Sequence, residues 1–251
     1  MTKLLKYEIR KTWIAKLIVL GITGVAEIAF LIGMLLVGTE TGDNITGISI
    51  AVLVLTAVFG VMVIGVQSVV TLHRDMNTKQ GYMLYMTPKT SPAILGAKML
   101  ENGISILLSG IFFFVLGFAD VTLMLARYGE LNKLWEIITE MMDTFRLEVD
   151  ITPASVGAFI FMLLASWLAT VSTAYFADIV SSALLNGKKY NGILTFILFI
   201  ALNMLMSAIL QKLPNMTTAV LTFVSSGVFA ILFSVVMYVV SSIVMERYLS
   251  V

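Results

Sequence analysis

The sequence contains no cysteine and a single histidine, His73. Without cysteine, the chain has no disulfide framework, no cysteine-ligated zinc and no cysteine nucleophile, and cysteine usage gives no information about the redox compartment. One histidine cannot build a multi-histidine metal site, and the zinc-binding HExxH pattern is absent. We therefore expect this chain to bind no metal.

Charge is also scarce. Charged residues make up 12% of the 251 residues, whereas a typical soluble domain carries roughly 25%. Hydrophobic residues make up 59%, and the mean hydropathy is +0.99. One soluble core could not bury this much apolar surface, so the composition indicates a protein dissolved in lipid. The formal net charge of +1 argues against a polyanionic partner such as nucleic acid.

Six apolar stretches are each long enough to cross a bilayer as a helix, which takes about 20 residues. They lie roughly at 16–38, 46–72, 94–126, 153–178, 192–211 and 218–244. We predict one all-α integral membrane domain over 1–251, with the apolar N-terminal run retained as a span rather than removed as a signal peptide. Ser91 before Pro92, and Thr152 before Pro153, each predict a helix N-cap followed by proline at the first helical position.

The distribution of lysine and arginine predicts the orientation. With the N-terminus inside, twelve of these residues fall on cytosolic segments and four on outer segments. The cytosolic set is Lys3, Lys6, Arg10, Lys11, Lys16, Arg74, Lys79, Lys89, Lys98, Lys188, Lys189 and Arg247, and the outer set is Arg127, Lys133, Arg146 and Lys212. This positive-inside bias predicts that both termini are cytosolic.

Residues 2–14 are predicted to form an amphipathic helix on the inner membrane surface. One side carries basic residues and another an apolar stripe, at helical spacing: Lys3, Lys6 and Arg10 on the first, Leu5, Ile9 and Trp13 on the second. The alternative is an ordinary basic flank of the first span.

The cytosolic loop after the second span places four consecutive large residues, Met83 to Met86, outside the membrane. An exposed apolar patch framed by charges is typical of a protein contact, and methionine and aromatic side chains suit the core of one. The alternative is that this segment lies back on the membrane surface. A further amphipathic helix is expected outside, over 130–146, as either a cap on an exit or a structural lid.

Four carboxylates fall within or near the spans, where ionisable groups are functional candidates. Glu27 is near the middle of the first span and either lines a polar conduit or is a protonated carboxyl bonded to a neighbouring helix. For Glu101, Asp120 and Asp178, simple solvation at the interfaces is expected. The conduit candidates are Glu27, Gln67 and Asn203, while Gln67, Asn102 and Asn203 are also candidates for hydrogen bonds between helices. Gly21, Gly24 and Gly60 are expected to permit close helix approach.

The sequence holds no recognisable catalytic motif. Asn186 to Lys189 lacks the first glycine and the Ser/Thr of a P-loop, and no serine nucleophile motif lies near His73. We therefore expect no enzyme and no ATPase site in this chain. The protein moves something, holds something or anchors a partner, and uphill transport needs energy from elsewhere.

The loop after the second span resembles the first cytosolic loop of permeases of the second ABC membrane class. The resemblance rests on Arg74, Asp75, Gly81, Met83, Leu84, Thr87, Pro88 and Ser91, and on the run Ile94 to Lys98 that opens the third span. The order of an N-terminal connecting helix, six spans and two cytosolic termini also matches that family over nearly the whole chain. One departure is that only Gln211 to Thr217 separates the fifth and sixth spans, where family members often carry external helices.

This resemblance implies a permease paired with a second copy or a homologue, and with separate ATPase subunits that bind ATP and Mg. The chain itself would bind no cofactor. The coupling helix that docks on the ATPase would include Arg74, Asp75, Gly81, Tyr82, Met83, Leu84, Tyr85, Met86 and Pro88. A lesser contact would include Asn186, Lys188 and Lys189.

We therefore expect the membrane subunit of an ATP-driven exporter in a cell membrane, most simply the bacterial cytoplasmic membrane. A conduit with few charges favours amphipathic or hydrophobic cargo, such as antimicrobial or toxin-like peptides, lipids or drugs. One alternative is a stand-alone secondary transporter or channel that uses Glu27 and Asn203. The other is a non-transporting anchor or sensor that recruits a partner through Met83 to Met86.

Overall fold

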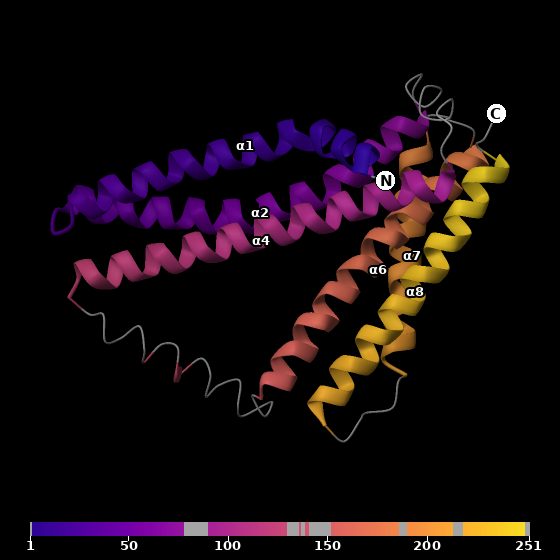
Figure 1. Cartoon of the computed structure of the whole chain (residues 1–251). Coiled ribbons are helices and arrows are strands. Elements are labelled where there is room, and N and C mark those ends of the chain that lie inside the picture. The colour runs from indigo at the N-terminus through magenta and orange to yellow at the C-terminus, as the bar shows by residue number, and fades with distance from the viewer. Residues whose placement is uncertain are drawn as a thin grey trace. The chain divides into compact units, whose positions relative to one another are not determined.

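The protein is all-helical in the computed structural model, which describes residues 2–77, 90–129, 136, 139–140, 152–185, 190–212 and 218–248 (Figure 1). Its helices are α1 (Thr2–Leu35), α2 (Glu40–Asn77), α4 (Ser91–Arg127), α6 (Pro153–Leu185), α7 (Asn191–Leu210) and α8 (Ala219–Tyr248). These six are all long and apolar enough to cross a membrane. The structure thus confirms the predicted helical class and the six membrane-length helices, which indicate a multi-pass membrane protein. The orientation stays a prediction.

Most helices are longer than the predicted spans. Helix α1 begins at Thr2 and runs to Leu35 without a break, so the predicted surface helix over 2–14 and the first span form one element. Helix α6 continues seven residues beyond the predicted end of its span, to Leu185. Hydropathy detects only the apolar part of a helix, so polar ends that continue the hydrogen-bonded ladder are missed.

Threonine side chains cap several helix starts. Thr152 caps α6 as predicted: its Oγ1 accepts from the Ser155 amide at 3.1 Å, and Ser155 Oγ accepts from the Thr152 amide at 2.9 Å. The predicted cap of α4 is wrong by one residue, because the carbonyl of Thr90, rather than Ser91, accepts the first helical hydrogen bonds. Thr39 caps α2 in the expected manner, by accepting from the Gly42 amide.

The chain divides into two compact units. The first, here called the α6 unit, takes the described parts of Met1–Leu5, Ser68–Leu100 and Asp143–Val251. The second, the α1 unit, takes the described parts of Lys6–Gln67 and Glu101–Met142. Helices α2 and α4 contribute one part to each unit. The single transmembrane domain expected over 1–251 stays a prediction.

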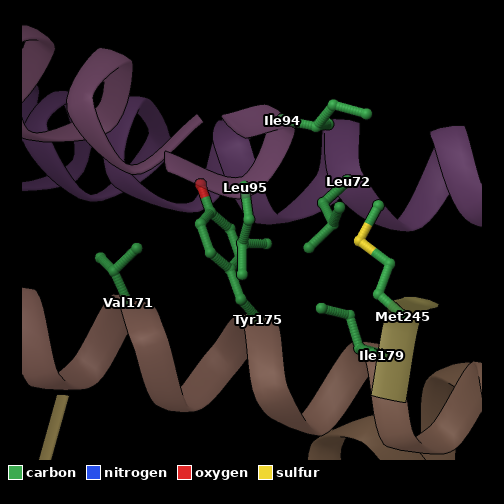
Figure 2. Close-up of a cluster of buried hydrophobic side chains, with 7 residues drawn as sticks. All are labelled: Leu72, Ile94, Leu95, Val171, Tyr175, Ile179 and Met245. Atoms are coloured by element: carbon green, nitrogen blue, oxygen red, sulfur yellow. The ribbon is translucent and has the colours of Figure 1, made fainter. Parts of the chain in front are cut away.

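The α6 unit is built around α6, which packs on both α7 and α8. Figure 2 shows its main apolar cluster, in which side chains of four helices meet. Its members are Leu72 of α2, Ile94 and Leu95 of α4, Val171, Tyr175 and Ile179 of α6, and Met245 of α8. A second cluster uses small residues, Ala165, Ala169 and Ala230 with Met206, which allow close approach of helix backbones.

The α1 unit contains a helical hairpin and the second part of α4. Leu36 to Thr39 join α1 to α2, and Gly38 adopts a φ of +91°, which favours glycine. Ala26, Phe30, Met34 and Leu53 form its buried apolar cluster, against which Leu116 and Met124 of α4 pack. This packing fixes the helices that carry the polar side chains described below.

Candidate functional site

Most residues of the two predicted ATPase contacts lie outside the described residues. These are Gly81, Tyr82, Met83, Leu84, Tyr85, Met86 and Pro88 of the first contact, and Asn186, Lys188 and Lys189 of the second. The structure does describe the helix ends from which both segments start and to which they return. Those helix ends all belong to the α6 unit.

A buried ion pair joins the two helices that bracket the first segment. Nζ of Lys98 on α4 donates to Oδ2 of Asp75 on α2 at 2.8 Å, and the two side chains are only 1% and 4% exposed. The neighbouring Arg74 is exposed. Because removing a charge from water is expensive, the pair holds these helix ends together only while both members are present.

Asp178 joins the same end of α2 to α6 and α7. Its Oδ1 lies 2.5 Å from Nδ1 of His73 on α2, and Oγ1 of Thr195 on α7 donates to that oxygen at 3.4 Å. The predicted solvation of Asp178 is wrong, because its side chain is fully buried where α6 packs among its neighbours. Its Oδ2 has no hydrogen-bond partner among the residues that the structure describes.

A second set of hydrogen bonds joins the end of α6 to the start of α7. Ser181 donates to the backbone carbonyl of Asn191 at 2.8 Å and also bonds its side-chain oxygen. Nδ2 of Asn191 donates to Ser182 at 2.8 Å. All three side chains are buried, so the helix ends that bracket the second segment are also tied together.

These contacts gather at one end of the α6 unit. The cluster of Figure 2 brings the second half of α6 and the final turns of α2 and α8 together with the first turns of α4. Asn191 adds the first turn of α7. We call this set of ion-paired and hydrogen-bonded helix ends the polar base, comprising His73, Asp75, Lys98, Asp178, Ser181, Ser182, Asn191 and Thr195.

In the α1 unit, Glu101 accepts three hydrogen bonds. Its Oε1 lies 2.6 Å from Nζ of Lys16, 2.7 Å from Oγ1 of Thr12 and 2.8 Å from Oγ of Ser105. The predicted solvation of Glu101 is therefore wrong, because its side chain is buried and bonds to the Lys16 cation and the Thr12 hydroxyl of α1 and to the Ser105 hydroxyl of α4 instead of water.

Glu27 of α1 interacts with Asp120 of α4. One oxygen of each carboxyl, Oε2 of Glu27 and Oδ1 of Asp120, is buried without a hydrogen-bond partner in the described part of the chain. Asp120 also lines a cavity of about 200 Å³ whose other lining side chains, such as Phe30 and Leu53, are apolar. The neighbouring helix that Glu27 contacts is thus α4. The role of Glu27 in a conduit stays a prediction.

The other conduit candidates are Gln67 and Asn203. Gln67 is half-buried in α2. Asn203 belongs to the α6 unit, and its Nδ2 donates to the Phe199 carbonyl of its own helix at 2.8 Å. Of the amides predicted to link helices, Asn102 does so, because its Nδ2 donates to the Gly65 carbonyl of α2 at 2.7 Å.

The N-terminal turns present the predicted basic residues outward. Lys3, Lys6 and Arg10 are exposed, and Trp13 is 52% exposed. Glu8 and Thr12 form the buried face of these turns, and Thr12 donates to Glu101 of α4. The contact of the stripe of Leu5, Ile9 and Trp13 with a membrane surface stays a prediction.

The sequence did not predict two of these contacts, that of Asp75 with Lys98 and that of His73 with Asp178. The partners are 23 and 105 residues apart, and no periodicity connects them. The one available signal was that an ionisable residue in a membrane-length helix needs a partner. The chain matches no family model, no curated protein and no solved structure.

Proposed function

We propose that this chain is the membrane-spanning permease subunit of an ATP-driven ABC exporter, powered by a separate ATPase subunit. The polar base is the observation that carries the proposal. Both segments expected to contact the ATPase start from helix ends that are tied together in one compact unit. A contact that transmits movement needs such a base, since a flexible attachment would absorb the displacement.

The expected mechanism is mechanical. Closure of two ATPase subunits around ATP displaces the segment between α2 and α4. The Asp75–Lys98 pair keeps the two flanking helix ends together, and the contact of His73 with Asp178 passes the displacement to α6. Packed helices then switch as rigid bodies between two arrangements.

The cargo is proposed to be amphipathic or hydrophobic, such as an antimicrobial or toxin-like peptide. The described helices present mostly apolar side chains to their surroundings, so a conduit between two such permeases offers few groups for a hydrophilic polymer. Photocrosslinking from position 27 in exporting cells tests this. Capture of a peptide or lipid supports the cargo class, whereas capture of a sugar polymer alone contradicts it.

The test of the proposed function is a mild-detergent purification from native membranes, with identification of every copurifying chain. We expect a P-loop ATPase with the parent and its loss with Leu84→Asp. The matched control is Leu131→Asp, the same change in the predicted outer segment, which should retain the ATPase. Absence of an ATPase from the parent, in membranes that preserve other such complexes, would contradict the proposal.

The contact of Glu27 with Asp120 favours a second candidate, a secondary transporter coupled to an ion gradient. Paired carboxyls within membrane-length helices are common carriers of protons or cations. Reconstituted protein without any ATPase distinguishes the candidates. Transport driven by an ion gradient and lost in Glu27→Gln supports the secondary transporter, and transport only with ATP and a partner supports the exporter.

A further inference from the structure

A groove in the α1 unit has a polar end and an apolar end. It has a volume of about 300 Å³ and is lined by α1, α4 and Ile64 of α2. Helices α1 and α4 run in the same direction here, because Thr12 and Lys16 pair with Glu101 and Ser105 in that order. Ile9, Trp13, Lys16 and Ser105 therefore mark one end of the groove, and Leu20, Leu108 and Phe112 mark the other.

Lys16 leaves one donor for a ligand at the polar end. Its ammonium group has three N–H donors. Two of them are directed at Oε1 of Glu101 and Oγ of Ser105, each at 2.6 Å. Lys16 is 18% exposed, compared with 3% for Glu101, so Lys16 is the more accessible member of this ion pair.

Lys6 adds positive charge beyond the groove. Lys6, Ile9, Trp13, Lys16 and Leu20 follow the spacing of one helix face, and the last four line the groove. Lys6 therefore lies about one turn beyond Ile9, the lining residue nearest the N-terminus, and is exposed. The charge of Lys16 is balanced by Glu101, so Lys6 supplies the uncompensated charge on this face.

The dimensions of the groove suit a lipid chain. From Ile9 to Leu20, α1 rises about 16 Å, close to half of the roughly 30 Å hydrocarbon core of a bilayer. Tryptophan favours the membrane–water interface, which agrees with the place of Trp13 beside the polar end. An anionic group there would meet Lys6 and the free donor of Lys16, and an acyl chain would follow the apolar end.

We propose that this groove binds an anionic phospholipid, with its phosphate near Lys6 and Lys16 and one acyl chain along Leu20, Leu108 and Phe112. This lipid site is independent of the cargo and of the ATPase. It requires only that α1 and α4 lie in the bilayer.

Quenching of Trp13 tests the site directly. The chain has three tryptophans, so Trp135→Phe with Trp167→Phe leaves Trp13 as the reporter. This protein is titrated in mixed micelles with dibrominated phosphatidylglycerol or with phosphatidylcholine of the same chains. We expect the anionic lipid to quench at a concentration about fivefold lower, since one lysine contributes that much to anionic lipid binding.

Lys6→Gln should abolish the preference for the anionic lipid without disturbing the Lys16–Glu101 pair. Lys11→Gln is the matched control, because it removes the same charge from the opposite face of α1. Ser109→Phe, which fills the apolar part of the groove, should weaken quenching by both lipids. Equal quenching of the parent by the two lipids, or equal losses in Lys6→Gln and Lys11→Gln, would overturn the proposal.

Discussion

At the residue scale, the charge of Lys98 is retained inside the protein only because Asp75 lies beside it. Lys98→Met should lower the free energy of unfolding by about 3–5 kcal/mol, since it leaves a buried carboxylate without its cation. The double variant Asp75→Leu with Lys98→Met should recover much of that loss. Thermal denaturation in detergent measures both, with exposed Lys212→Met as the control. A single variant as stable as the parent would contradict the ion pair.

Glu27 and Asp120 differ from the Asp75–Lys98 ion pair, because both of these interacting side chains are acids. Like charges in close contact repel each other, and an amide retains the shape and hydrogen-bonding capacity of the carboxyl. We therefore expect Glu27→Gln to be at least as stable as the parent in a detergent melting experiment. Glu101→Gln is the informative comparison, because Glu101 pairs with a cation, and its loss should lower the melting temperature. A large loss in Glu27→Gln would show that its charge is needed.

At the element scale, Gly60 sets how closely α2 approaches its neighbours. A Cβ at this position would lie 2.7 Å from Cγ1 of Val19. Gly60→Ala should therefore lower the free energy of unfolding by about 1–3 kcal/mol, as overpacking does, and adding Val19→Ala should restore part of it. Gly24→Ala is the control on α1, because nothing lies within 4 Å of its added Cβ. Melting curves of these variants in one detergent provide the test.

The same glycines show what could be predicted from the sequence. The six membrane-length helices in the described part of the chain followed from hydropathy, because the bilayer fixes the length of an apolar helix. The close approach expected at Gly60 is confirmed, whereas within the described residues of this chain nothing lies close to Gly21 or Gly24. Lipid-facing and protein-facing positions of a membrane helix are both apolar. The pattern of hydrophobicity therefore does not identify which face packs on other helices.

The candidate site was less predictable for a related reason. The sequence identified Glu27 as unusual but not its partner Asp120, and it placed Glu101 and Asp178 in water. Their partners come from other helices far along the chain, and side-chain pairing of this kind follows from packing rather than from periodicity. Thr152 was predicted correctly as a cap, because its partner is only three residues away. The bond of Asn102 to another helix was also predicted, but not the Gly65 carbonyl that accepts it.

At the scale of the whole molecule, the positive-inside pattern predicts which surfaces face the cytosol. The chain has no cysteine, so single cysteines can be introduced without altering a background. Thr90→Cys and Tyr190→Cys should react with a membrane-impermeant maleimide only in inverted vesicles. Glu40→Cys and Tyr128→Cys should react in intact cells. All four positions are exposed in the structure. The reverse labelling pattern would invert the predicted orientation.

The short connection between α1 and α2 has a consequence for how the protein enters the membrane. Only Leu36 to Thr39 separate the two helices, and Gly38 allows the turn. No lysine or arginine lies between Lys16 and Arg74, so nothing in the turn opposes translocation. The first two helices can thus partition from the translocon into lipid as a paired insertion unit, before α4 has been synthesised.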